Sequence, residues 1–125
     1  MQRLMVAALT SGAGKTSVTM GLAALWRQAG KTVQVYKTGP DYIDPQFHTA
    51  ITGRPCINLD PYFLSESELS ETFSRYQSEA DILLIEAAMG LTDGIAGQGD
   101  RASALEVARA LDVPVLLLVA RGQEG

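Results

Sequence analysis

The sequence of 125 residues has one cysteine, one histidine and no long apolar run. A single cysteine excludes a disulfide within the chain, as is typical of proteins of a reducing cytoplasm. His48, the single histidine, has no partners at metal-ligand spacing, so zinc is not expected. No apolar run approaches the roughly 18 residues of a membrane span, and the strand expected directly after Met1 leaves no room for a signal peptide. We therefore expect a cytoplasmic protein that does not enter a membrane.

Positive charge is also scarce, with 10 Lys and Arg against 14 Asp and Glu and a net charge of −4. Without a cluster of basic residues, neither nucleic acid nor an anionic membrane surface is an expected partner. The apolar content of 46% and the charged content of 19% are typical of a globular protein. The length corresponds to one domain.

Four apolar runs predict strands buried on both faces, as in a parallel sheet: residues 3–9, 32–38, 81–87 and 113–119. Three segments between them have apolar residues at helical spacing: 15–29, with Val18, Leu22, Leu25 and Trp26; 66–77, capped by Ser65 or Ser67, with Leu69, Phe73 and Tyr76 on one face; and 101–111. Strands that alternate with helices predict a doubly wound α/β domain of three layers. Residues 39–63 fit neither period, and a loop of that length is usually functional.

The stretch between the first strand and the first helix has the composition of a phosphate-binding loop. Small residues let backbone N–H groups converge on an anion at the positive end of a helix. Lys15 would reach the outer phosphates of a nucleotide and the Thr16 hydroxyl would bind Mg²⁺, as in the core Gly-x-Gly-Lys-Thr of the Walker A motif. Leu9 stands where the full motif has glycine, and a glycine-rich turn that opens an ordinary helix is the alternative. The expected nucleotide-binding residues are Thr10, Ser11, Gly12, Ala13, Gly14, Lys15, Thr16 and Ser17.

Polar segments follow the other strands at the edge where a doubly wound sheet binds ligands. Glu86 directly follows an apolar run, at the place of a Walker B acid that holds Mg²⁺, although it could instead cap a helix. Asp41 and Asp44 follow the second strand and could bind the metal and orient the acceptor, or serve as turn residues. Asp93 fits a simple turn equally well. Cys56 lacks the surroundings of a nucleophile and is interpreted as packing.

Four motifs together resemble the cobyrinic acid a,c-diamide synthase family: Ser11–Thr16, Lys37–Pro45 with Phe47 and His48, Gly53–Pro55 with Asn58–Pro61, and Met89–Gly94. The resemblance implies an ATP-dependent, glutamine-hydrolysing amide synthase of corrinoid biosynthesis. It implies a P-loop nucleotide-binding domain of the dethiobiotin synthetase type and a separate C-terminal glutaminase domain. The implied reaction phosphorylates a peripheral carboxylate of the tetrapyrrole, and ammonia then displaces the phosphate.

By this resemblance, Asp41 and Glu86 would bind Mg²⁺ with Thr16, and the catalytic residues would be Lys15, Asp41, Asp44 and Glu86. Substrate contacts are expected from Lys37, Tyr42, Ile43 and His48. The chain departs from the family's usual pattern at three positions, which hold Ala87, Thr92 and Val119.

The resemblance also predicts that residues 1–125 form only part of the nucleotide-binding domain, with the glutaminase domain or another ammonia source outside the chain. The four predicted strands would have the order second, third, first, fourth. The fourth strand would then leave Val115–Leu118 at an exposed edge, which favours a homodimer. A partitioning ATPase, which would carry lysine in place of Thr10, a dethiobiotin synthetase-like enzyme and an inactive nucleotide-binding fragment remain alternatives.

Overall fold

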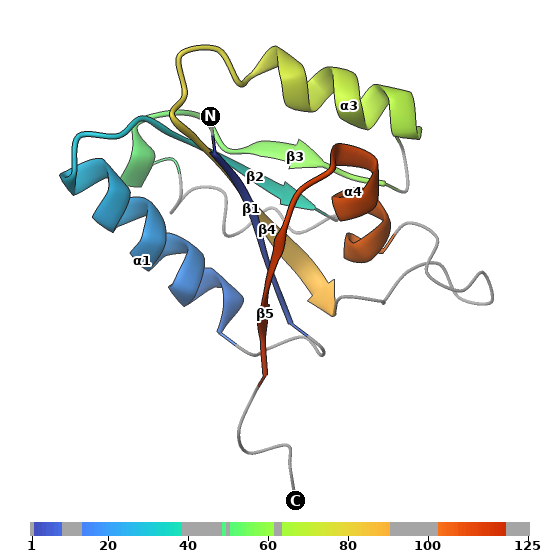
Figure 1. Cartoon of the computed structure of the whole chain (residues 1–125), viewed down its shortest axis with the longest axis horizontal. Helices are drawn as coiled ribbons and strands as arrows, with labels where there is room; N and C mark the ends of the chain where they lie inside the picture. Colours follow the sequence, from blue (N-terminus) through green and yellow to red (C-terminus); the bar gives the residue numbers. More distant parts are fainter. Residues whose placement is uncertain are drawn as a thin grey trace, which may run out of the picture.

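The computed structural model describes residues 2–8, 14–38, 49, 51–61, 64–90 and 103–119 (Figure 1). Its strands are β1 (Gln2–Ala8), β2 (Val33–Thr38), β3 (Ile57–Leu59), β4 (Ile82–Gly90) and β5 (Val115–Leu118). Its helices are α1 (Lys15–Gln28), α3 (Glu66–Arg75) and α4 (Ala104–Leu111). The four predicted strands and three predicted helices are confirmed, with ends within a few residues of the expected ones.

The strands form one parallel sheet in the order β3-β2-β4-β1-β5. The order predicted for the four longer strands is therefore confirmed, and β5 lies at one edge. The other edge is β3, which the sequence did not predict. This strand has three residues with the polar Asn58 in the middle, so it shows no apolar run. It pairs with the end of β2, from Tyr36 opposite Ile57 to Thr38 opposite Leu59.

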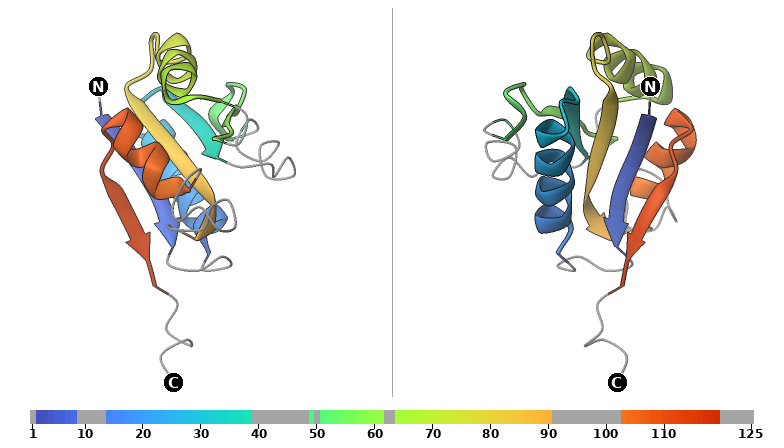
Figure 2. Two further views of the ribbon diagram at one scale, coloured as in Figure 1. Left: turned by 90° about the vertical axis from the view of Figure 1, so that its right-hand side faces the viewer. Right: turned by 60° about the vertical axis from the view of Figure 1, so that its left-hand side comes forward.

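The molecule has the three expected layers, with α1 on one face of the sheet and α3 and α4 on the other (Figure 2). Successive residues of a strand point to opposite faces. Val35 of β2 and Leu84 of β4 pack on the α1 side, whereas Tyr36 and Ile85 pack with α3 and α4. The next residues, Lys37 and Glu86, therefore lie on the α1 side, near the carboxyl ends of their strands.

The N-termini of the helices differ in how they are capped. Ser65 and Glu68 form a reciprocal capping box at α3, which confirms Ser65 as the first of the two predicted caps. Ser103 caps α4 by accepting a hydrogen bond from the Glu106 N–H. The residue before α1 is Gly14, which has no side chain that could cap the helix. Its φ of 84° is a left-handed conformation that glycine adopts without strain.

Two details of the predicted apolar faces are wrong. Leu25, predicted on the apolar side of the first helix, is 64% exposed, whereas Trp26 packs against the sheet as expected. Tyr76, predicted to share a face with Leu69 and Phe73, ends α3 and is exposed, and only the other two are buried. Among the residues that the structure describes, no helix combines the length and apolar character that crossing a membrane requires.

Candidate functional site

The N-terminal end of α1 carries concentrated positive charge. Lys15 is its first residue and is only 7% exposed. The buried Thr19 hydroxyl donates a 2.7 Å hydrogen bond to the Lys15 carbonyl, which ties this residue to the next turn. The first turn has no acidic residue, so no side chain within it offsets the positive end of the helix dipole. An anion is the natural ligand of such a helix end.

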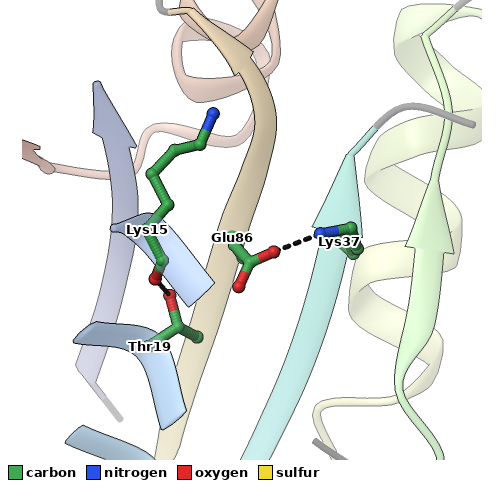
Figure 3. A network of polar contacts seen from close by, with 4 residues as sticks. All are labelled: Lys15, Thr19, Lys37 and Glu86. Atoms are coloured by element: carbon green, nitrogen blue, oxygen red, sulfur yellow. Dashed lines mark hydrogen bonds and ion pairs between the residues drawn. The ribbon is translucent and has the colours of Figure 1, made fainter. Parts of the chain in front are cut away.

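A buried ion pair lies beside this helix end, on the same side of the sheet. Lys37 of β2 and Glu86 of β4 stand directly opposite each other in the parallel register. The Lys37 ammonium donates a hydrogen bond to the Glu86 carboxylate, and the two side chains are 2% and 1% exposed (Figure 3). Lys15, drawn in the same view, extends toward the carboxyl ends of the strands. Two cations and one carboxylate are thus held at the edge where ligands bind in such sheets.

Cys56 lies within electrostatic reach of the pair. Burial and, to a smaller extent, the Glu86 carboxylate raise the pKa of its thiol to about 12, although Lys37 acts in the opposite direction. A thiol with such a pKa is protonated at neutral pH and is a poor nucleophile. It packs against the apolar cluster on the α1 side, which confirms the interpretation as packing.

The structure brings together the predicted site residues that it describes. Gly14, Lys15, Thr16 and Ser17 open α1, and Lys37 and Glu86 face each other across β2 and β4. Glu86 lies inside β4, so the alternative in which it caps a helix is wrong. The remaining predicted residues lie outside the described part of the chain: Thr10, Ser11, Gly12, Ala13, Asp41, Tyr42, Ile43, Asp44, His48 and Asp93.

The donor set suits Mg²⁺. The described residues contain no cluster of three or more histidine, cysteine or acidic side chains, which a protein-only metal cage would need. Mg²⁺ instead usually takes one or two carboxylates, a hydroxyl, water and the phosphates of a bound nucleotide. Glu86 of β4 and Thr16 of α1 would be the carboxylate and the hydroxyl for such an ion. The residues present therefore fit this ion.

A second polar network explains the motif Gly53-Arg54-Pro55. The Arg54 side chain donates to the Gln34 amide oxygen (2.8 Å) and to the backbone carbonyls of Tyr76 (3.2 Å) and Ser78 (3.3 Å). Gln34, which is 1% exposed, donates in turn to the Pro55 carbonyl (2.8 Å). The motif thus fastens the segment before β3 to β2 and to the end of α3. The sequence singled out the motif but gave no indication of this role.

The comparisons with known proteins agree with this geometry. Residues 4–120 match the family described as the CobQ/CobB/MinD/ParA nucleotide binding domain. The chain belongs to this family. The expected recognition is thereby confirmed, and so is the P-loop type of α/β fold.

Two proteins similar to this chain are named cobyrinate a,c-diamide synthase. That of Synechococcus sp. is 44% identical over 116 residues, and that of Syntrophotalea carbinolica is 45% identical over 117 residues. A hydrogenobyrinate a,c-diamide synthase of Agrobacterium fabrum is 45% identical over 117 residues. These matches cover 93%, 94% and 93% of this chain but 25%, 26% and 27% of the relatives. The chain therefore spans about a quarter of their length.

Proposed function

We propose that the protein provides the nucleotide-binding and phosphoryl-transfer site of an ATP-dependent amide synthase that acts on peripheral carboxylates of a corrinoid or related tetrapyrrole. The observation that carries this proposal is the convergence of the uncapped α1 end, Lys15 and the Lys37–Glu86 pair at one edge of the sheet. The names of the similar relatives supply the substrate class.

The reaction suits a site whose main resources are charge and position. A substrate carboxylate oxygen attacks the γ-phosphorus of ATP, the bond to ADP breaks, and an acyl phosphate forms. Ammonia then attacks the acyl carbon, phosphate leaves, and the nitrogen loses a proton to give the amide. Oxide is too poor a leaving group for direct amide formation, and phosphorylation supplies a better one. Phosphoryl transfer depends chiefly on positioning and charge neutralisation.

Each residue has a role in this scheme. The α1 N-terminus and Lys15 bind the phosphates, together with Thr10–Ala13, and Thr16 and Glu86 hold Mg²⁺, with Asp41 as a further ligand. When bound, Mg²⁺ neutralises the polyphosphate. Asp44 orients the substrate carboxylate, and Tyr42, Ile43 and His48 contact the tetrapyrrole. Glutamine or free ammonia supplies the nitrogen through a glutaminase domain or another source beyond residues 1–125.

A partitioning ATPase is the alternative within the same family, whose description also includes MinD and ParA. Thr10 occupies the position at which such ATPases carry a signature lysine, which favours the synthase. The two functions differ in what stimulates ATP turnover. A corrinoid acid stimulates a synthase, whereas a partitioning ATPase responds to a protein or surface partner.

The first test is calorimetric titration with MgATP of the parent protein and of Lys15→Ala, with Lys31→Ala as control. Lys31 is exposed in the α1–β2 turn, so its loss removes the same charge without touching the site. We expect binding by the parent and the control and at least tenfold weaker binding by Lys15→Ala. Asp41→Ala should weaken binding of the Mg²⁺ complex more than that of metal-free ATP. Absence of binding by the parent would refute the nucleotide site.

The second test follows the phosphorylated intermediate with a corrinoid acid whose carboxylates carry ¹⁸O. Free ammonia replaces glutamine, so no glutaminase is required. An acyl phosphate transfers one labelled oxygen from the carboxylate to the released phosphate. Unlabelled phosphate together with amide formation would refute this route, and ATP turnover that ignores the corrinoid acid would favour the ATPase.

A further inference from the structure

The Lys37–Glu86 pair occupies the place where the proposed function needs a metal ligand. The two residues are opposite each other in the β2–β4 register, and neither side chain is more than 2% exposed. The carboxylate is thus in contact with an ammonium group of the protein itself (Figure 3). A divalent cation that approaches Glu86 therefore meets the positive charge of Lys37, which already contacts the Glu86 carboxylate.

Both cations cannot share this carboxylate at low cost. The Lys37 ammonium and a divalent cation would compete for the same Glu86 carboxylate, and burial weakens the screening of their mutual repulsion. The ammonium is carried by a flexible stem of four carbons, so it can move away more easily than Glu86 can reorient within its strand. Binding of a divalent cation to Glu86 therefore requires that Lys37 moves.

We propose that Lys37 holds the place of the divalent cation on Glu86 and that cation binding displaces it. This inference rests on the proposed function, because it takes Glu86 as the metal ligand. Lys37 then lowers the affinity of the site for metal alone. The displaced ammonium, the metal and Lys15 all lie on the α1 side of the sheet, and an anion bound there neutralises all three. Metal and nucleotide polyphosphate thus bind cooperatively, and Lys37 is the positioning residue that couples them.

The test measures Mn²⁺ affinity without nucleotide, from the electron paramagnetic resonance signal of free Mn²⁺. We expect Lys37→Met to bind Mn²⁺ at least tenfold more tightly than the parent, because a buried positive charge beside the site is gone. Lys31→Met is the matched control, with the same substitution at an exposed position, and should change the affinity less than twofold. The double variant Lys37→Met/Glu86→Gln should lose the tight site. Affinity of Lys37→Met equal to or weaker than that of the parent would overturn the proposal.

A measurement on the parent protein keeps the test valid if Lys37→Met does not fold. The ε-carbon of Lys37 is observed by NMR in protein labelled with ¹³C-lysine, and its signal is assigned by its absence from Lys37→Arg. Saturation with Mg²⁺ and ADP should shift this signal, whereas that of Lys31 should stay in place. An unmoved Lys37 signal at saturation would overturn the displacement.

These outcomes are distinct from those of the proposed function. Tighter Mn²⁺ binding by Lys37→Met, together with the absence of ¹⁸O transfer in the parent, would leave the displacement standing and refute the synthase reaction. The opposite combination would refute the displacement alone. A larger gain in Mn²⁺ affinity on addition of ADP in the parent than in Lys37→Met would support the proposed coupling.

Discussion

Removal of one partner of the buried ion pair should destabilise the fold far more than removal of both. Lys37 and Glu86 are 1% exposed, and the residues two positions earlier, Val35 and Leu84, belong to an apolar cluster. An unpaired charge in such a place costs about 3–5 kcal/mol, whereas replacement of a whole buried pair is often neutral. Lys37→Met and Glu86→Gln keep the size of each side chain, so cavity formation adds little. Each single variant should therefore lose about 3–5 kcal/mol, a large part of a total stability of about 5–15 kcal/mol.

Urea unfolding followed by circular dichroism measures these values in a double-mutant cycle. The double variant should recover most of the loss, which gives a coupling energy of at least about 2 kcal/mol. The control is the ion pair of Glu71 and Arg75 on α3, joined at 3.2 Å with side chains that are 71% and 60% exposed. Its coupling energy should stay below about 0.5 kcal/mol. If each single variant loses less than about 1 kcal/mol of unfolding free energy, and the two losses add without a coupling energy, water screens the Lys37–Glu86 pair. That result would refute the reasoning.

The other predictions concern separate features of the fold. Gly14→Ala should destabilise the protein by about 1–2 kcal/mol because its φ is 84°, whereas Gly21→Ala, inside α1 with no atom near the added carbon, should stabilise it by about 0.5–1 kcal/mol. The same sign for both in urea unfolding would contradict this reasoning. Arg54→Ala should cost about 1–3 kcal/mol because it leaves the buried amide oxygen of Gln34 without its donor, and a loss under about 0.5 kcal/mol would argue against that role. Cys56 should be alkylated at pH 8 roughly a thousandfold more slowly than in the unfolded chain, because its pKa is raised from 9.0 to about 12. The stabilisation that accompanies this shift is complete below pH 9 and is lost as the pH rises towards 12, so flat stability over that range would contradict it. The protein should dimerise at high concentration through the edge strand β5, and Leu117→Lys should give a monomer by light scattering, since Leu117 is 40% exposed there. A parent protein that is monomeric at every concentration would refute that interface.

The sequence predicted the sheet well because its longer strands are buried on both faces. A strand such as Ile82–Ile85 must be apolar at every position when layers cover both sides, and such a run is easily recognised. The strand β3 could not be found in this way. It lies at an edge and has only three residues. It pairs with β2, and a hydrogen bond from Arg54 to Gln34, 20 residues apart in the sequence, joins the preceding segment to the same strand.

The apolar face of α1 shows where periodicity was insufficient. Its buried positions are Lys15, Thr19 and Ala23, each four residues from the next, and two of them are polar. At roughly 100° per residue, Leu25 lies about 200° from Ala23 and so faces away from the sheet. The large apolar residues of α1, taken alone, therefore placed the middle of its buried face incorrectly. The side that packs against the sheet is mixed, because Val18, Leu22 and Trp26 pack partly buried beside the buried Lys15, Thr19 and Ala23.

The same limit explains why the sequence assigned roles to Lys37 and Glu86 but did not pair them. Each residue directly follows a run of buried residues in its strand. A buried charge at that place needs an ion-pair partner or a ligand, because an unpaired buried charge is costly. Whether the two charges meet depends on the strands being neighbours and on the register that sets Lys37 opposite Glu86. The predicted strand order already made β2 and β4 neighbours, so the register was the missing piece of information. Neighbouring parallel strands that start at the same level also end at the same level, so charged residues at their carboxyl ends lie close together. A lysine and a glutamate in such positions should therefore be tested for an ion pair before either residue is assigned to ligand binding.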